Sequence, residues 1–482
     1  MNVALKGHGG MQLPSFVTSI PTGQERGQYL AVDLGGTNCR ICSVELHGDS
    51  TYRLSQEKYT IPRELMVNSS HEPLFDYVAE NIQAFIAVAQ DADSQRNASL
   101  MHRQKLGFTF SFTYESHSLC RGTMLQWDKG WDIPDALGKD PCQMLQNAID
   151  RLSLPVVVVA LTNDSVGTLM ASAYTAGRTA VPLIGAIFGT GTNAAYIERL
   201  SNIKRLHHDD SWAPNSSTDV MVVNTEWGAF FDDDSLHLPT TEYDDVLDKA
   251  SVNPGDQLFE KRVSGMYLGE LARLAIMSLV AAQELDMLVC KSSPLMESYA
   301  ITSEFLTLMA KAGENADDTI VGAIETVLGV TDLSVRDIKS IGCISSAIVQ
   351  RSARLSAAAM AAIIEQSGEL KHAYSWTHYL QNTFRLLLQK VSNSLHVLRG
   401  IFCLKACHTG NTDRDAMAVA DDSVGIGIDG SLYELYPYYD QYIRGGLRDI
   451  KTIGVAGERK VQMHLVKDGS SLGAALVAQS TG

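Results

Sequence analysis

The chain has 482 residues, with 39 Lys and Arg against 55 Asp and Glu, and a formal net charge of −16 at pH 7. Apolar residues make up 45% and charged residues 20%, which is typical of a compact globular protein and excludes a disordered or fibrous class. The negative net charge repels polyanions, so we expect neither nucleic acid nor an anionic membrane as a partner. Any bound phosphate needs backbone amides, helix N-termini, a metal ion or a few placed cations.

The length exceeds one ordinary core and fits two large lobes. The eight cysteines are scattered, mostly within apolar segments, which favours free thiols and a cytoplasmic protein. Cys403, Cys407 and His408 lack a second ligand pair at zinc spacing, so we expect no dedicated metal site. The first ten residues contain no long apolar segment, and no stretch reaches about 18 uninterrupted apolar residues, so neither a secretory signal nor a membrane span is expected.

The first third of the chain predicts alternating strands and helices. Residues 29–60 contain three strand patterns separated by turn-forming residues. Helical spacing of apolar residues follows over 73–90, then a short buried strand pattern over 106–112 and a second helical segment over 135–152. Residues 154–161 are all apolar, as expected of a central strand covered on both faces. The expected order is βββαβαβ.

The opening pattern returns near Leu183. The segment LIGAIFGTGTNAAYIE has the same plan as YLAVDLGGTNCRICSVE: an apolar strand, a glycine turn closed by Thr-Asn, and a second apolar strand. We interpret the two as related hairpins that open two lobes. A third strand-turn-strand is expected at 424–435, joining the second lobe, and helices are expected to dominate between 258 and 365.

The two glycine turns are candidate phosphate sites. Gly35 and Gly36 in the first turn, and Gly189 and Gly191 in the second, let the backbone approach a polyanion closely. Small hydrogen-bonding side chains accompany them: Thr37, Asn38, Thr192 and Asn193. Neither turn is a Walker A loop or a GxGxxG motif. A single turn of this kind is more often a plain hairpin turn, but a pair with matching flanks favours a clamp for one triphosphate.

Asp164 directly follows the buried segment that ends at Leu161. At the carboxyl edge of a parallel sheet, a carboxylate can orient and deprotonate an attacking hydroxyl. The alternative is a helix N-cap, because Asn163, Asp164 and Ser165 are all capping residues. The local sequence supports both interpretations equally.

Amide and carboxylate side chains suited to sugar hydroxyls occur in two later segments. Asn224 and Glu226 lie in NTEWGAF, and Gln257 and Glu260 lie in DQLFEK. In a desolvated cleft, an unmatched hydroxyl costs about 1–3 kcal/mol, so such groups recognise a polyol. The alternative is solvated surface, and for Glu260, beside Lys261 and Arg262, the local sequence favours that alternative.

These segments, in this order, resemble the hexokinase family of the actin-like ATPase superfamily over nearly the whole chain. The matching segments are LPSFVTSIPTGQERGQYLAVDLGGTNCR, LGFTFSF, GTMLQWDKGW, ALTNDSVGTLMASAY, IGAIFGTGTNAAYIE, NTEWGAF, DQLFEKRVSGMYLGEL, IDGSLYELYP and DGSSLGAAL. The resemblance implies an α/β fold of two lobes, ribonuclease H-like, with a cleft between a small lobe (24–163 plus 455–482) and a large lobe (164–454), after an N-terminal segment (1–23).

The resemblance also implies ATP-dependent transfer to a hexose (glucose, fructose or mannose), with Mg²⁺, in a monomer or homodimer. Asp164 becomes the base for the sugar 6-hydroxyl. The implied sugar contacts are Ser111, Asp128, Lys129, Asn163, Asn224, Glu226, Gln257 and Glu260. The implied phosphate and nucleotide contacts are Asp33, Gly35, Gly36, Thr37, Asn38, Arg40, Gly189, Gly191, Thr192, Thr302, Asp429, Gly430 and Ser431.

Several positions depart from the family pattern. Thr113 replaces a usual Pro, Asp128 a usual Thr or Ser, and Phe231 and Ser471 usual glycines. Asp128 adds negative charge to a cleft that also holds ATP, which is unfavourable at low dielectric. Residues 371–420 look longer than the family connection, either as a true insertion or as an error in the sequence.

Two hypotheses follow. The first is a working hexokinase, which has its whole implied catalytic core. The second is a hexokinase-like regulatory or sugar-sensing protein with weak turnover, which the departures favour. A third class, an actin-like structural or chaperone ATPase, would not need the sugar contacts. The sequence does not specify the preferred hexose or the product inhibition.

Overall fold

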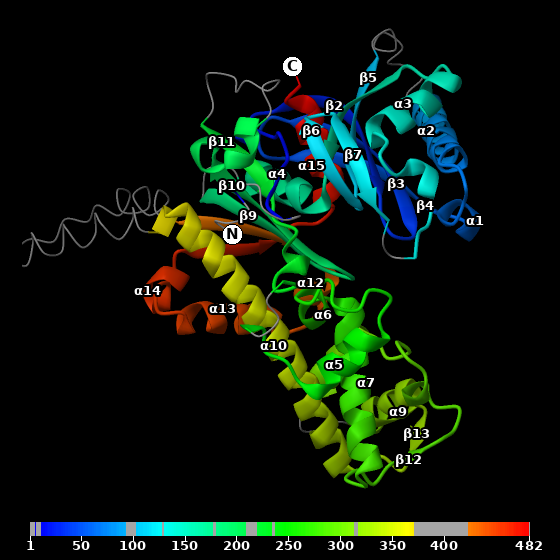
Figure 1. Cartoon of the computed structure of the whole chain (residues 1–482), viewed down its shortest axis with the longest axis vertical. Coiled ribbons are helices and arrows are strands. Elements are labelled where there is room, and N and C mark those ends of the chain that lie inside the picture. The colour runs from blue at the N-terminus through cyan, green and yellow to red at the C-terminus, as the bar shows by residue number, and fades with distance from the viewer. Residues whose placement is uncertain are drawn as a thin grey trace, which may run out of the picture.

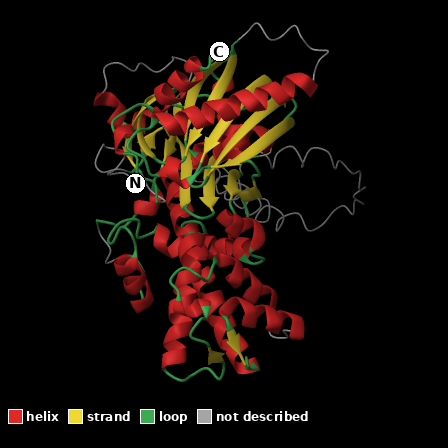
Figure 2. Cartoon of the chain, turned by 90° about the vertical axis from the view of Figure 1, so that its right-hand side faces the viewer, coloured by secondary structure: helices red, strands yellow, loops and turns green. Residues whose placement is uncertain are grey.

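The structure is a computed structural model that describes residue 5 and residues 11–92, 103–127, 130–176, 180–208, 219–233, 237–312, 317–370 and 423–481. Two sheets occupy the upper part of Figure 1, and a group of helices extends below them. The side view in Figure 2 shows the same division, with strands gathered above and helices filling the lower half. The predicted segment 371–420 lies outside the described residues.

The first sheet has five strands. In spatial order they are β4 (Tyr52–Thr60), β3 (Asn38–His47), β2 (Arg26–Leu34), β5 (Gln104–Phe110) and β8 (Val156–Thr162). Strands β4, β3 and β2 are antiparallel neighbours, whereas β2, β5 and β8 run parallel. The predicted strands within 29–60, 106–112 and 154–161 are therefore confirmed.

Helices cover the outer face of this sheet. They are α1 (Arg63–Met66), α2 (Glu72–Ala92) and α3 (Pro141–Arg151), and α2 and α3 share one buried apolar cluster with β2, β3 and β5. Helix α3 begins later than the predicted 135–152, because Asp140 accepts the amide of Cys142 at 2.9 Å and Pro141 occupies the first helical position.

The second sheet has six strands and repeats this plan. Its order is β1 (Leu13–Pro14), β11 (Val220–Asn224), β10 (Thr192–Arg199), β9 (Val181–Phe188), β14 (Val424–Asp429) and β15 (Val461–Leu465). Strands β11, β10 and β9 are antiparallel, and β9, β14 and β15 are parallel. The hairpins β2–β3 and β9–β10 occupy equivalent places, which confirms the predicted repeat.

Two sequence predictions were wrong in detail. Segment 424–435 is a strand followed by helix α12 (Ser431–Leu435), not a strand pair, because Gly430 turns the chain and Glu434 N–H donates to its carbonyl at 3.1 Å. The order βββαβαβ also omitted the hairpin β6 (Thr113–Ser118) and β7 (Arg121–Gln126), whose strands are largely polar and show little apolar alternation.

Helices α4 (Asp164–Ala176) and α15 (Gly469–Gln479) lie between the two sheets. Helix α4 packs on β9 and β14 of the second sheet, α15 packs on β2 and β5 of the first, and the two helices pack on each other. Glycine makes this crossing possible, since a Cβ at Gly473 would lie 2.2 Å from Gly167 Cα. The helices thus join the sheets and bring the starts of α4 and α15 to the same region.

Most of the remaining helices extend into the lower half of Figure 1. They are α5 (Glu242–Ala250), α6 (Glu260–Val263), α7 (Gly265–Ala281), α8 (Ser303–Ala312), α9 (Asp318–Leu328) and α10 (Val335–Ser367), joined by the short strands β12 (Leu288–Val289) and β13 (Val330–Thr331). Helices were predicted between 258 and 365, and this is confirmed.

Helix α10 is the long central helix of this helical part. It packs against α7, α8 and α13 (Tyr439–Asp449), which is followed by α14 (Gly454–Glu458). Among the described residues it is the one helix whose length and composition would allow it to cross a membrane. More than half of its most apolar window is buried inside the protein, as expected of a core helix.

The chain passes from the second sheet to the first near its C-terminus. Strand β15 pairs with β14, and the next helix, α15, packs on β2 and β5. The lobe boundaries at 24–163 plus 455–482 and at 164–454 stay predictions.

Candidate active site

The junction between β8 and α4 decides the role of Asp164. Asn163 caps the helix: its Oδ1 accepts the Ser165 amide at 2.9 Å and the Ser165 hydroxyl at 2.7 Å. Its carbonyl accepts the amide of Gly167 at 2.9 Å. Asp164 is therefore the first residue of the helix rather than its cap, and its half-buried carboxylate accepts the Ser165 amide at 2.8 Å. Its position is the carboxyl edge of parallel strands β5 and β8.

A group of amide and carboxylate side chains lies beside this junction. The Nδ2 group of Asn193 has three acceptors: Asn224 Oδ1 at 2.9 Å, Glu226 Oε1 at 3.2 Å and Asn163 Oδ1 at 3.4 Å. Asn224 Nδ2 also donates to Glu226 Oε1 at 2.7 Å. An amide nitrogen carries only two hydrogens, so Asn193 shares them among three acceptors. The four residues form what we call the amide cluster: Asn163, Asn193, Asn224 and Glu226.

Asn193 was expected at a phosphate turn, and its place in the amide cluster was missed. It lies one residue into β10, directly after Thr192. Side chains alternate along a strand, so neighbours in sequence serve opposite faces. Thr192 accordingly accepts the Trp227 indole at 3.0 Å while Asn193 bonds to the cluster. The alternation alone could have separated the two roles.

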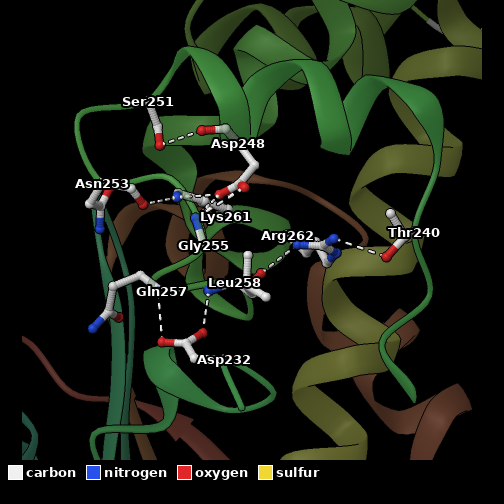
Figure 3. A network of polar contacts seen from close by, with 10 residues as sticks. All are labelled: Asp232, Thr240, Asp248, Ser251, Asn253, Gly255, Gln257, Leu258, Lys261 and Arg262. Carbon is white, nitrogen blue, oxygen red and sulfur yellow. Dashed lines mark hydrogen bonds and ion pairs between the residues drawn. The ribbon is translucent and has the colours of Figure 1, made fainter. Parts of the chain in front are cut away.

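Gln257 lies on a segment fixed by Asp232. The amides of Gln257 and Leu258 both donate to the Asp232 carboxylate at 2.9 Å (Figure 3). Gln257 has a left-handed backbone, with φ 56°. A Cβ at Gly228 would lie 2.2 Å from Gln257 Oε1, so the Gln257 side chain rests on the segment that follows Glu226. The two expected sugar-contact segments are thus in contact.

The charged run at 260–262 is not solvated surface. Lys261 is 1% exposed, and its Nζ donates to Asp248 at 2.6 Å and to the Asn253 carbonyl at 2.7 Å. Arg262 is also buried and donates to backbone carbonyls and to Thr240 (Figure 3). Because both cations point into the protein, Glu260 can face the other way. Its Oε2 accepts the Thr192 amide of the second glycine turn at 2.9 Å.

The second glycine turn is held by its neighbours. Gly189 N–H donates to the Gly191 carbonyl at 3.0 Å, and the Gly265 amide at the start of α7 donates to the Gly189 carbonyl at 2.8 Å. Gly430 has φ 119°, and a Cβ there would lie 2.3 Å from the Phe188 carbonyl. Ser431 follows Gly430 at the surface. Thr302 is also exposed and lies beside α7, against Gly269.

The first glycine turn is closed by the Gly35 amide, which donates to the Asn38 carbonyl at 3.0 Å. Asn38 Nδ2 donates to Thr37 Oγ1 at 2.7 Å. Ser111 lies next to this turn, because its amide donates to the Leu34 carbonyl at 3.2 Å. Asp128 and Lys129, the other expected contacts from this part of the chain, lie outside the described residues.

The start of α15 lies between the two turns. Ser470 Oγ donates to Asp33 Oδ2 at 2.8 Å, and Arg40 Nη1 lies 3.8 Å from the same oxygen, on the first turn's strands. The neighbouring amide of Gly469 acts on Asp429, and Gly430 packs on the second turn. A continuous row of contacts therefore runs from the first turn through the N-terminus of α15 to the second, which is a favourable place for anions.

Two titratable groups report how close these parts are. The pKa of Asp429 is raised to about 6, mainly by burial and in part by the charge of Asp164, while the amides of Gly430 and Gly469 and the charge of Arg40 lower it. Burial also raises the pKa of Tyr114, which lies on β6, and the charges of Glu226 and Asp164 add to this rise. Asp164 is thus electrostatically coupled to Asp429 at the end of β14 and to Tyr114 on β6.

The structure accommodates three of the sequence departures. Phe231 adopts φ 74°, so the backbone makes the turn that glycine would make, at a cost in strain. Ser471 is fully buried and accepts the Cys42 thiol at 3.2 Å. Thr113 begins β6.

The two similar sheets with crossed helices between them confirm the expected actin-like ATPase fold, and the polar groups at their junction suit a sugar kinase of this fold. Comparison with known proteins gives the same answer. Family models described as Hexokinase match residues 1–174 and 183–480. The chain belongs to the hexokinase family.

Individual relatives cover nearly all of the chain. A glucokinase of Aspergillus niger is 39% identical over 97% of this chain and 88% of its own length. Glucokinase-1 of Saccharomyces cerevisiae is 36% identical over 97% of this chain and 87% of its own. The solved hexokinase from Schistosoma mansoni complexed with glucose is 29% identical, has a TM-score of 0.74, and matches 100% of this chain and 92% of that one.

Proposed function

We propose that this hexokinase transfers the γ-phosphoryl group of ATP to the 6-hydroxyl of a hexose, with glucose as the preferred acceptor. The observation that carries the proposal is the position of Asp164 between two chemically different groups. Asn163, directly before it, belongs to the amide cluster. The charge of Asp164 acts on Asp429, which lies beside Gly430 and the second glycine turn. The names of the glucokinase relatives support glucose.

The sugar side consists of the amide cluster, Gln257 and Glu260, together with Asp128 and Lys129, which lie outside the described residues. Amides and carboxylates present both donors and acceptors, as vicinal hydroxyls require. Ser111 would contribute from the edge of the first sheet. Because the cluster's own hydrogen bonds already orient its members, less ordering is needed when sugar binds.

The ATP side consists of both glycine turns, the start of α15, and the segment from Asp429 to Ser431, with Thr302 at the nucleotide end. Within the described residues no group of three or more His, Cys, Asp or Glu could hold a metal by itself. Asp33 and Asp429 supply carboxylate oxygens, the ligands that Mg²⁺ prefers, and they fit an ion that arrives with ATP. Mg²⁺ would neutralise charge on the phosphates, and Arg40 lies near enough to assist.

Asp164 would accept the proton of the sugar 6-hydroxyl as the oxygen attacks phosphorus. Asn163 caps α4 and fixes where the helix begins, which puts the carboxylate of Asp164 at the first position of the helix. Helices α4 and α15 each carry one sheet, so movement at their crossing would close the lobes and exclude water, a competing acceptor.

The second hypothesis is a sugar sensor with weak turnover. Because Phe231 and Ser471 fit the fold, Asp128 is the departure that still favours this hypothesis. A coupled assay with glucose, fructose and mannose separates the two hypotheses. We expect sugar 6-phosphate from glucose at a rate of about 1–1000 per second, the range of most enzymes. Calorimetric binding of glucose by folded protein with no phosphate transfer to any hexose would favour the sensor.

A further inference from the structure

The first glycine turn is tied to the expected sugar-binding segment by one indole. Trp131 Nε1 donates to the Gly36 carbonyl at 2.6 Å. Trp131 lies two residues after Lys129 in the sequence, and it is 5% exposed. A single hydrogen bond thus joins a residue of the segment WDKGW to the turn that would bind phosphate.

The position of this indole is itself strongly determined. Trp131 stacks on Trp127, with ring centroids 5.2 Å apart and an interplanar angle of 13°. It also makes a T-shaped contact with Phe112, with ring centroids 4.9 Å apart. The following residue is fixed on both sides, since Asp132 N–H donates to the Met66 carbonyl at 2.9 Å and its carbonyl accepts Asn68 N–H at 3.0 Å. The ring therefore has little freedom to follow a moving turn.

This bond orients an amide of the turn. In a trans peptide the carbonyl and the next N–H point in opposite directions, so holding the Gly36 carbonyl on Trp131 directs the Thr37 N–H away from the small-lobe core. The Thr37 carbonyl is also held, by the Ile61 amide at 3.1 Å. Within the described part of the chain, neither the Gly36 nor the Thr37 amide donates to a protein acceptor. Both amides are thus available to an anion.

We propose that Trp131 is a positioning residue, whose indole N–H sets the first glycine turn for the phosphates of ATP and links that turn to the sugar-binding segment. This inference rests on the proposed function for its ligand. It predicts that loss of the N–H weakens nucleotide binding and leaves sugar binding nearly unchanged, because the amide cluster and Gln257 lie on other elements.

The test compares two indoles of the same cluster. Trp131→Phe keeps an aromatic ring and removes the N–H, and a benzothienylalanine at 131 keeps the ring's size and replaces only the N–H with sulfur. The control is Trp127→Phe, because Trp127 is similarly buried but its Nε1 donates to the Ile133 carbonyl at 2.8 Å, not to a turn. Calorimetry measures the Kd of a non-hydrolysable ATP analogue with Mg²⁺ at saturating glucose, and the Kd of glucose alone.

We expect both changes at Trp131 to raise the Kd of the analogue by about three- to tenfold, the range of one lost hydrogen bond, with the Kd of glucose within about twofold of the parent. Trp127→Phe keeps an aromatic ring against Trp131, so the Kd of the analogue should change by less than about twofold. Unchanged analogue binding in the benzothienylalanine protein, or an equal loss in Trp127→Phe, would overturn the inference. Because the readout is binding, a parent without phosphoryl transfer would refute the proposed function and leave this comparison valid.

Discussion

The charge of Asp164 raises the pKa of Asp429, although Asp164 begins α4 and Asp429 ends β14. The coupling places the expected base and a nucleotide-side carboxylate within electrostatic reach of each other. Like charges in a partly buried site destabilise each other's ionised form. Cations brought by ATP would relieve this repulsion, so the free protein holds part of its active site in an unfavourable state.

Asp429→Asn should therefore stabilise the free protein at neutral pH. Burial raises the folded pKa to about 6 from the ordinary 3.8, so the group's stabilising effect is complete below the unfolded pKa and is lost as pH rises through about 6. At about pH 7.5 the variant should gain up to about 2–3 kcal/mol in the free energy of unfolding, and near pH 4.5 much less. Urea unfolding at both pH values measures this difference in the free energy of unfolding. A gain in stability that does not depend on pH would contradict the raised pKa of Asp429. We also expect the variant to transfer phosphoryl groups more slowly than the parent.

Asn193→Ala should weaken sugar binding. Removing its amide takes away the donor to Asn224 Oδ1 and one of the two donors to Glu226 Oε1, and so disorders the cluster. We expect a cost of about 1–3 kcal/mol, or about fivefold to 150-fold in the Kd of glucose. Calorimetry measures this Kd directly. The Kd of the ATP analogue should change by less than about twofold, and an equal loss for both ligands would place Asn193 at the phosphate turn instead.

Gly430→Ala should disrupt the second turn. The new Cβ would meet the Phe188 carbonyl at 2.3 Å in a backbone of φ 119°, so we expect a loss of about 3 kcal/mol or more in stability together with loss of nucleotide binding. Gly445→Ala is the control, since a Cβ there meets nothing within 4 Å and lies within α13. The control should be neutral or stabilising by up to about 1 kcal/mol in thermal unfolding. Equal effects of the two changes would contradict the close approach at Gly430.

Asp232→Ala should loosen the segment that carries Gln257. Two backbone amides would lose a half-buried acceptor, so we expect a loss of about 1–3 kcal/mol in stability and a severalfold rise in KM for glucose, with KM for ATP little changed. Asp233→Ala is the matched control, because Asp233 is exposed. A fall in stability without any change in the KM for glucose would show that Asp232 supports the fold alone.

The strands and most helices could be predicted because their patterns are local. Alternating or continuous apolar residues specify β2, β9 and β8 whatever surrounds them. Segment 430–435 was not predictable in this way. Its helix depends on Gly430 packing against the second turn, a contact between residues far apart in the sequence.

The site shows the same limit. The local sequence could not decide whether Asp164 is a catalytic carboxylate or a helix cap, since Asn163, Asp164 and Ser165 can all cap. The hydrogen bonds from Ser165 to Asn163 Oδ1 identify Asn163 as the cap. Glu260 looked solvated beside Lys261 and Arg262, because the acceptors Asp248 and Thr240 of these two cations lie more than ten residues away in the sequence. The family motifs in the sequence pointed to the residues of the site. The contacts that orient these residues could not be predicted from the sequence.

The most direct test of the account is phosphoryl transfer by Asp164→Asn. This change keeps the size of the side chain and removes the base, so the rate of glucose 6-phosphate formation should fall by about a hundredfold to ten-thousandfold, while the Kd of glucose stays within about tenfold of the parent. A variant that phosphorylates glucose within tenfold of the parent's rate would contradict the role of Asp164 and the proposed mechanism.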